Sequence, residues 1–180
     1  MSDGLIPKRY AKALYKYANE MGDAEKIYEH LKDFNFRETA IDDLKRAVRN
    51  PNISDENKGE LLSQVMDCKN LPTLNKFILL VVRNNRAEYL RRISLAYIDL
   101  YREEHNIAHV IVTAACKLQE KELDEIVGVV RKQLPDMQLE VEQTIDPELI
   151  GGFVVRIGSL VLDASVKTEL NNLRLKLNKT

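Results

Sequence analysis

The sequence predicts an α+β protein: an N-terminal six-helix bundle followed by a small α/β domain with a β-hairpin and a terminal helix. Over the first ~105 residues, apolar side chains recur every three or four positions, which is the helical period. Beyond them, β-branched runs and alternating apolar and polar residues indicate strands. We therefore place the two domains at residues 1–105 and 106–180 of the 180-residue chain.

The composition is that of a folded, charge-balanced protein. The chain is 44% hydrophobic and 31% charged, with a formal net charge of -1, so it lacks the basic excess typical of nucleic-acid-binding proteins. Its longest fully apolar run, Phe77 to Val82, is far shorter than the ~20 residues of a membrane span. Lysines stand where a signal peptide would be apolar, so we expect the protein to stay on the side where it is made.

The two cysteines, Cys68 and Cys116, are far apart in the sequence and make no disulfide framework. We expect both to be small buried apolar residues in a reducing compartment.

The first three helices follow from their apolar spacing. In the first, Pro7 lies near the start and Gly22 near the stop, as helix ends favour. Its apolar face is Tyr10, Leu14, Tyr17 and Met21. The second has Ile27, Leu31 and Phe34, and the third has Ile41, Leu44 and Val48 before Asn50-Pro51.

Three further helices complete the predicted bundle. Ser54 caps the fourth, ahead of acidic residues that suit the positive end of a helix dipole. Its expected core side is Leu61, Leu62, Val65 and Met66. The fifth begins after Pro72 and is apolar nearly all round at its centre, which predicts burial on most sides. The sixth covers about 87–104, with Leu90, Ile93, Tyr97 and Tyr101 on one side. Short loops imply antiparallel neighbours.

The second half predicts strand, helix, strand. Residues 108–116 are β-branched or small and show no helical period. The helix before Pro135 has a shared apolar face of Leu123, Ile126, Val127, Val130 and Leu134. The next strand alternates, with Leu139, Val141 and Ile145 on one face and Glu140, Glu142 and Thr144 on the other.

The glycines of residues 146–166 raise a choice between a phosphate-binding loop and a turn. The lysine of a Walker loop is missing after Gly151-Gly152, and a strand-like Phe-Val-Val follows instead of a helix. We therefore predict a sharp bend at the glycine pair and a hairpin whose two-residue loop, Gly158-Ser159, forms a type II′ turn.

The hairpin prediction fixes which side chains face which way. Phe153, Val155, Ile157, Leu160 and Leu162 are expected to be buried on one side. On the other side, Arg156 is expected to interact diagonally with Asp163. Ser165 can cap a terminal helix whose seam is Val166, Leu170, Leu173 and Leu177, and this helix either covers the sheet or offers its seam to a partner.

Residues 150–177, "IGGFVVRIGSLVLDASVKTELNNLRLKL", resemble the C-terminal signature of the delta subunit of F-type ATP synthases, the counterpart of the oligomycin-sensitivity-conferring protein. The matching signature residues are Gly151, Gly152, Arg156, Gly158, Asp163 and Ser165. Ala164 stands where the family usually has glycine, which puts the local turn geometry in question. "YAKALYKYA" at residues 10–18 and "NNR" at residues 84–86 also resemble family motifs, so the resemblance extends over essentially the whole chain.

The resemblance implies a non-catalytic stator connector in the peripheral stalk of a proton-translocating F-type ATP synthase, without cofactors. The N-terminal domain would take the N-terminal helix of an alpha subunit between its first and fifth helices. That groove would involve Tyr10, Ala11, Leu14 and Tyr17, with Phe77, Leu80, Val81 and Asn84 opposite. The C-terminal domain would hold the C-terminal ends of the b subunits. The protein would lie at the cytoplasmic face of the bacterial membrane, peripheral to it, and would be a monomer when isolated.

Other functions find less support in the residues. His30, His105 and His109 fall in three different elements without ligand spacing, so we expect no metal site. No Ser/His/Asp arrangement is evident. The main alternative is an RNA- or ribosome-associated two-domain protein using the basic residues Arg83, Arg86, Arg91 and Arg92. Acidic residues interrupt that run, and we expect no nucleic-acid partner. A small-molecule-binding regulatory protein, with the C-terminal sheet as ligand site, is a further alternative.

Overall fold

The computed structural model describes residues 4–36 and 53–177. The chain divides between Glu103 and Glu104 into two units, which are taken separately below. The α+β class is confirmed. The helix expected around Ile41, Leu44 and Val48 lies outside the described residues, so a six-helix bundle stays a prediction.

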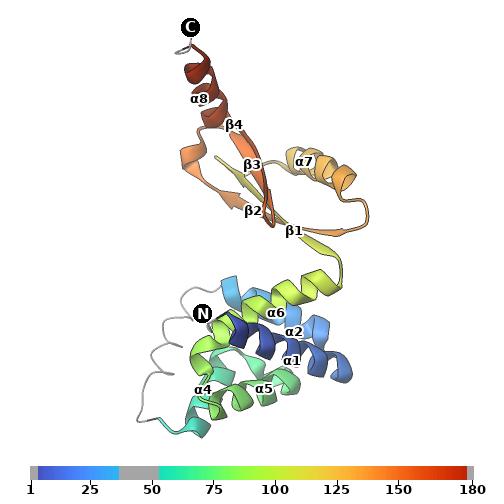
Figure 1. The fold of residues 1–180 in the computed structure, drawn as a ribbon, viewed down its shortest axis with the longest axis vertical. Helices are drawn as coiled ribbons and strands as arrows, with labels where there is room; N and C mark the ends of the chain where they lie inside the picture. Colours follow the sequence, from blue (N-terminus) through green and yellow to red (C-terminus); the bar gives the residue numbers. More distant parts are fainter. Residues whose placement is uncertain (1–3, 37–52, 178–180) are drawn as a thin grey trace. The chain divides into compact units, whose positions relative to one another are not determined.

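The described part of the first unit is helical. Its α-helices are α1 (Leu5–Met21), α2 (Ala24–Phe36), α4 (Asp55–Val65), α5 (Pro72–Arg83) and α6 (Leu90–Glu104), with 3-10 turns at Cys68–Asn70 and Ala87–Tyr89 (Figure 1). The expected ends are confirmed for two helices. Gly22 ends α1 with a left-handed φ of 73°, a conformation that glycine adopts without a Cβ penalty. Ser54 caps α4, because its hydroxyl accepts a hydrogen bond from the Asn57 amide at 3.3 Å.

Tyrosines tie α6 to α2 inside the first unit. The four residues predicted for the inner face of α6 are all buried. The Tyr97 hydroxyl donates to the Ala24 carbonyl oxygen at 3.0 Å, and burial raises the pKa of this hydroxyl above its usual range. The ring of Tyr101 stacks on that of Tyr28, with centroids 4.3 Å apart. The aromatic stripe of α6 is therefore core packing.

Two residues of the expected core side of α4 are not buried. On α4 only Leu62 and Met66 are buried, whereas Leu61 and Val65 are 38% and 39% exposed. On α5, Leu80 is 51% exposed and lies between half-buried Leu79 and buried Val81. Each of these helices has an uncovered side, so its flanking apolar residues remain in solvent.

The second unit is a four-stranded sheet with one helix on it. Its elements are β1 (Ile107–Ala114), α7 (Glu120–Gln133), β2 (Gln138–Ile145), a 3-10 turn at Pro147–Leu149, β3 (Gly152–Ile157), β4 (Leu160–Ser165) and α8 (Val166–Leu177). The strand order is β2-β1-β3-β4. β1 and β2 are parallel, which requires a crossover, and α7 provides it. β3 pairs antiparallel with β1 and with β4.

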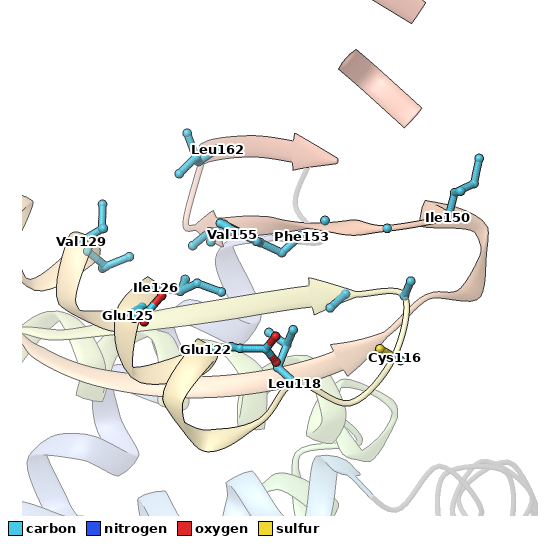
Figure 2. Close-up of a pocket in the computed structure, with 15 residues that line it drawn as sticks. Cys116, Leu118, Glu122, Glu125, Ile126, Val129, Ile150, Phe153, Val155 and Leu162 are labelled. Atoms are coloured by element: carbon cyan, nitrogen blue, oxygen red, sulfur yellow. The ribbon is translucent and has the colours of Figure 1, made fainter. Parts of the chain in front are cut away.

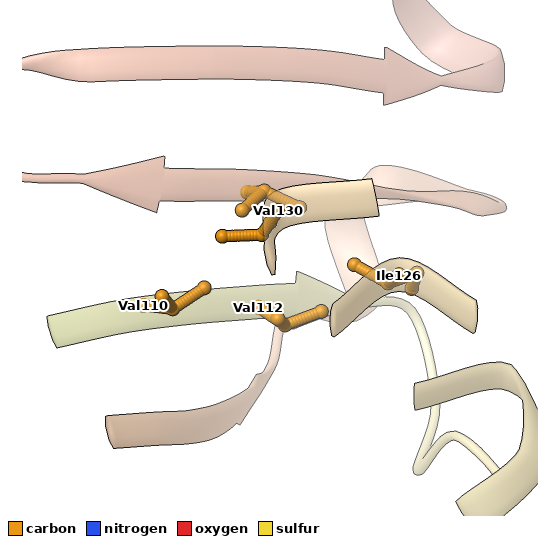
Figure 3. Packing of buried hydrophobic residues seen from close by; sticks show 5 residues of the cluster. Val110, Val112, Ile126 and Val130 are labelled. Atoms are coloured by element: carbon orange, nitrogen blue, oxygen red, sulfur yellow. The ribbon is translucent and has the colours of Figure 1, made fainter. Parts of the chain in front are cut away.

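One face of the sheet packs against α7. Val110 and Val112 of β1 meet Ile126 and Val130 of α7 (Figure 3), and Val155 of β3 belongs to the same buried cluster. All five are buried. Every second residue of β1 is buried, as expected for a central strand covered on one face. The expected helix and strands of this half are confirmed.

The predicted hairpin is confirmed in register: Ile157 lies opposite Leu160, and Val155 lies opposite Leu162. Gly158 has a φ of 56°, as the first turn position requires. The predicted burial of five side chains is wrong for two of them. Leu160 and Leu162 are 68% and 54% exposed, because α7 packs over β1 and β3 and leaves β4 open.

Two other sequence-based expectations need correction. Cys68 is buried, which raises the pKa of its thiol to about 12, with a smaller contribution from the charge of Asp67. Cys116, however, is exposed, because it follows β1 in a loop. Asp163 does not pair with Arg156. Its carboxylate instead accepts hydrogen bonds from the Ser165 amide at 2.9 Å and the Thr168 hydroxyl at 2.8 Å.

The glycine pair makes a bend that only a residue without a side chain fits. Gly152 has a φ of 73°, and a Cβ placed there would lie 2.3 Å from the carbonyl oxygen of Ala164. The Val166 amide also donates to the Gly151 carbonyl oxygen at 3.1 Å. The turn before β3 thus touches the end of β4 and the start of α8. Ala164 lies within β4 opposite Phe153, so alanine fits there without a left-handed backbone.

Gly152→Ala should destabilise the C-terminal unit by at least about 2 kcal/mol more than Gly158→Ala. Both glycines have positive φ, so alanine at either position strains the backbone. Nothing lies within 4 Å of a Cβ at Gly158, so Gly158→Ala adds no steric clash, whereas Gly152→Ala does. The free energy of unfolding in urea, followed by circular dichroism, measures the difference. Equal losses for the two variants would contradict the close approach of Gly152 to β4.

The Asp163 contacts predict an acid-dependent start of α8. Hydrogen bonds from Ser165, and then from Thr168, lower the pKa of the Asp163 carboxyl. The stabilisation is therefore complete above the ordinary carboxyl pKa of about 3.9 and is lost as the pH falls through the lowered value. The Ser165 amide proton shift, followed by NMR, should titrate with a midpoint below about 3.9. In Asp163→Asn this titration should vanish, and a wild-type midpoint at or above the ordinary value would count against the arrangement.

Candidate partner-binding site

The two helices expected to form a groove lie side by side. α1 packs against α5, and the ring of Tyr10 meets the ring of Phe77 edge to face, with centroids 6.3 Å apart. The aromatic pair therefore joins the segments that the sequence places far apart.

The eight residues expected in that groove divide into core and surface. Four are buried and unavailable on the surface: Ala11, Leu14, Phe77 and Val81. Tyr10 and Tyr17 are half-buried, Leu80 is 51% exposed, and Asn84 is exposed. The structure thus brings Tyr10 and Phe77 together, whereas half of the expected set is buried and cannot meet a partner at the surface.

Sequence reasoning missed further apolar residues near this surface. Leu5 is 72% exposed on the first turn of α1, and Ile6 beside it is half-buried. Helical spacing aligns Ile6, Tyr10, Ala13 and Tyr17 along one side of α1. We call these four residues together with Leu80 and Asn84 the outer stripe. The apolar pair Leu5-Ile6 at the start of α1 was the available signal, because it extends the apolar face predicted from Tyr10 toward the N-terminus.

A second apolar feature lies in the C-terminal unit, between α7 and the β3–β4 hairpin. It is a cleft of about 570 Å³ (Figure 2). Its lining residues are Ala114, Ala115, Cys116, Leu118, Glu122, Glu125, Ile126, Val129, Val130, Ile150, Gly151, Gly152, Phe153, Val155 and Leu162. Apart from the Cys116 thiol, the ionisable groups among them are two carboxylates, Glu122 and Glu125. This cleft is an apolar site with an acidic side.

The cleft was not predicted, for a physical reason. Val129 lies on the flank of α7 and is 51% exposed, outside the predicted apolar face. Leu162 was assigned to the buried side of the hairpin. The sequence signal for the cleft was Val129, an apolar residue that lies beside the predicted apolar face of the helix and not within it. Glu122 is already engaged, because its carboxylate accepts a hydrogen bond from the Gln119 amide at 2.8 Å and so caps α7.

The signature residues of the hairpin shape the backbone. Gly151, Gly152 and Gly158 form the bend and the turn, and Asp163 and Ser165 start α8. The Ser165 hydroxyl accepts a hydrogen bond from the Thr168 amide at 3.3 Å, which confirms the predicted cap. Arg156 is exposed on the opposite face of the sheet from the α7 core. The signature therefore builds the hairpin–helix junction and brings no reactive groups together.

Two of the three histidines make local contacts. A ring nitrogen of His30 contacts the Met66 carbonyl oxygen, and His109 pairs with Glu142 at 2.9 Å across β1 and β2. Within residues 4–36 and 53–177, no group of three metal-binding side chains gathers. Over the same ranges, no helix has the length and apolar character to cross a bilayer.

Comparison with known proteins identifies relatives along nearly the whole chain. The family model "ATP synthase delta (OSCP) subunit" matches residues 6–177. ATP synthase subunit delta of Azobacteroides pseudotrichonymphae genomovar. CFP2 is 30% identical over 177 residues, covering 98% of this chain and 100% of the relative. The subunit delta of Syntrophobacter fumaroxidans (strain DSM 10017 / MPOB) is 34% identical over 180 residues, covering 99% and 98%.

The fold also matches a solved structure. A chain in the cryo-EM structure of the Toxoplasma gondii mitochondrial ATP synthase hexamer superposes with a TM-score of 0.65 at 23% identity. The match covers 95% of this chain and 96% of that one. At this identity the similarity concerns the fold. Together with the family model and the curated relatives, these matches confirm the resemblance seen in the sequence and displace the RNA-binding and small-molecule-binding alternatives. This chain belongs to the ATP synthase delta (OSCP) subunit family, whose members are non-catalytic subunits of the peripheral stalk.

Proposed function

We propose that this protein joins the catalytic head of an F-type ATP synthase to its peripheral stalk with one binding surface on each unit. The helical bundle, residues 1–105, takes the N-terminal helix of an alpha subunit. The α/β unit, residues 106–180, holds the C-terminal ends of the b subunits. Family membership supports the stator role, and an apolar surface on each unit supports the division of labour.

The observation that carries the alpha-subunit contact is the outer stripe of α1 and α5. Half-buried Tyr17 and exposed Leu80 leave apolar surface available to solvent on the two helices that the Tyr10–Phe77 contact joins. An amphipathic helix recognises such a surface through apolar residues at spacings of three and four. Tyrosine adds contact area together with a polar tip.

The proposed role is mechanical. The head must not turn with the rotor, so each contact must outlast the torque of a catalytic step. Affinity in protein complexes is adjusted mostly through the dissociation rate, so long-lived contacts are tight ones. We expect nanomolar binding, about -12.3 kcal/mol, in the assembled complex.

The location and state of the protein follow from the same role. We place it at the cytoplasmic face of a bacterial membrane, attached through its partners in a proton-translocating synthase. We expect a monomer when the chain is isolated.

Leu80→Asp and Tyr17→Asp should each weaken binding of an alpha-subunit N-terminal peptide by at least about tenfold, because a charge replaces a contacting apolar side chain. Fluorescence anisotropy with the peptide from the same synthase measures this. Leu95→Asp is the matched control, since Leu95 is a similarly exposed leucine, at 43%, that belongs to α6 and not to the outer stripe. Circular dichroism checks that all three variants remain helical. Affinities equal to wild type for both test variants would exclude the outer stripe as the alpha-subunit site.

A further inference from the structure

We propose that a cluster of arginines between α5 and α6 recognises acidic residues beside the apolar row of the helix that docks on the outer stripe. We call this cluster the arginine corner, and its members are Arg83, Arg86, Arg91 and Arg92. The inference rests on the proposed function and adds the chemistry by which the surface distinguishes its partner from other amphipathic helices.

The arginine corner concentrates positive charge in a chain that is nearly neutral. Residues 83–92 hold four arginines and one acidic residue, Glu88, whereas the whole chain has a formal net charge of -1. All four arginines are exposed. Within residues 4–36 and 53–177, none of the four forms an ion pair with a carboxylate. Their mutual repulsion is therefore not compensated inside the fold, and an anionic partner would relieve it.

Two of these arginines stand where a helix disfavours cations. Arg91 and Arg92 lie in the first turn of α6, which has no acidic residue. The N-terminal end of a helix carries a partial positive charge, so a carboxylate there is stabilising and a cation is not. Both side chains also lie outside the core. A binding role explains a placement that neither the helix dipole nor core packing favours.

Arg86 is held in position for a contact with a carboxylate. Its guanidinium carbon lies 6.0 Å from the centre of the Tyr89 ring, and its backbone amide donates to the Val81 carbonyl oxygen at 3.0 Å. A guanidinium that lies over a ring keeps the N–H groups at its edge available for a carboxylate. Arg86 is therefore partly ordered before a partner arrives.

The arginine corner continues the outer stripe at one end. The Thr73 hydroxyl, near the start of α5, donates to the Asp23 carboxylate just after the end of α1 at 2.6 Å. Farther along α5, Phe77 meets Tyr10, which lies earlier in α1. The two helices therefore run in opposite directions, and α5 ends toward the start of α1. Asn84 of the outer stripe directly follows Arg83, so a helix lying along the stripe would bring one end to the corner.

The first helix adds positive charge along the same stripe. Residues 4–19 contain no acidic residue, and their four basic residues are all exposed: Lys8, Arg9, Lys12 and Lys16. An apolar stripe bordered by cations fits an amphipathic helix with an acidic flank. A nucleic acid would meet the cations but has no apolar row with which to cover the stripe. The occupant that satisfies both features is an acidic amphipathic helix.

The double variant Arg91→Glu with Arg92→Glu tests the proposal, because it reverses charge at the corner while suiting the dipole of α6. The probe is the alpha-subunit N-terminal peptide from the same synthase, mixed with the full chain and followed by stopped-flow anisotropy. At about 0.05 M salt the association rate constant should fall at least about tenfold, because rim charges act mainly on association. At about 1 M salt the two proteins should associate at equal rates. The thermal midpoint should equal or exceed that of wild type, which separates the loss from unfolding.

Three controls locate the effect. Arg131→Glu with Lys132→Glu, on α7, changes the net charge equally, and association should stay within about twofold of wild type. Arg91→Lys with Arg92→Lys keeps the charge and should keep the rate. A peptide whose acidic residues are replaced by the corresponding amides should bind wild type slowly, and the charge-reversed variant should then cause no further loss.

The outcomes separate the inference from the function on which it rests. If wild type does not bind the peptide at all, the proposed head contact is wrong, and the inference fails with it. If wild type binds but the charge-reversed variant associates at the wild-type rate in low salt, only the role of the arginine corner is wrong. Equal slowing by the α7 control would assign the effect to net charge and overturn the proposal. Tighter binding of single-stranded RNA or of phosphatidylserine vesicles than of the peptide, lost in the charge-reversed variant, would overturn it in favour of that ligand.

Discussion

One-sided burial is the constraint on which the rest of this structure depends. A helix packed on one neighbour, or a sheet covered by one helix, buries a single face. Among the described residues, each unit leaves apolar side chains exposed at the edge of such a face. Leu80 in the first unit and Leu162 in the second lie directly beside buried residues yet remain half exposed. Apolar side chains left at such edges lower the free energy when a partner covers them. The two proposed surfaces are thus consequences of incomplete coverage.

The hairpin–helix junction keeps the second surface in place. Gly152 lets the chain approach the backbone of Ala164 closely, and the Asp163 carboxylate with the Ser165 hydroxyl holds the first turn of α8. Because α8 follows β4 without a loop, the junction also prevents the chain from covering its own cleft. The same few residues that resemble the family signature therefore shape the backbone and, indirectly, keep the cleft open.

The charge distribution suits a protein that acts by binding. Described acidic and histidine side chains make structural contacts, such as the cap between Glu122 and the Gln119 amide and the cross-strand pair of His109 with Glu142. The membership of the chain in a non-catalytic family agrees with this arrangement. Function in such a protein depends on the shape and lifetime of contacts, so its surfaces are more informative than its ionisable groups.

The sequence by itself determined the described helices and strands and the hairpin register, because helical and strand periods, glycine turns and hydroxyl caps are local properties of neighbouring residues. It also showed the family, through motifs spread along the chain. Gly22, Ser54 and Gly158–Ser159 were predicted in the positions that the structure gives them. Only the tertiary structure decided the strand order β2-β1-β3-β4 and which apolar residues remain exposed. Burial depends on what lies across from a residue, and neither Cys116 nor Leu162 has a local pattern that reveals the absence of a covering helix.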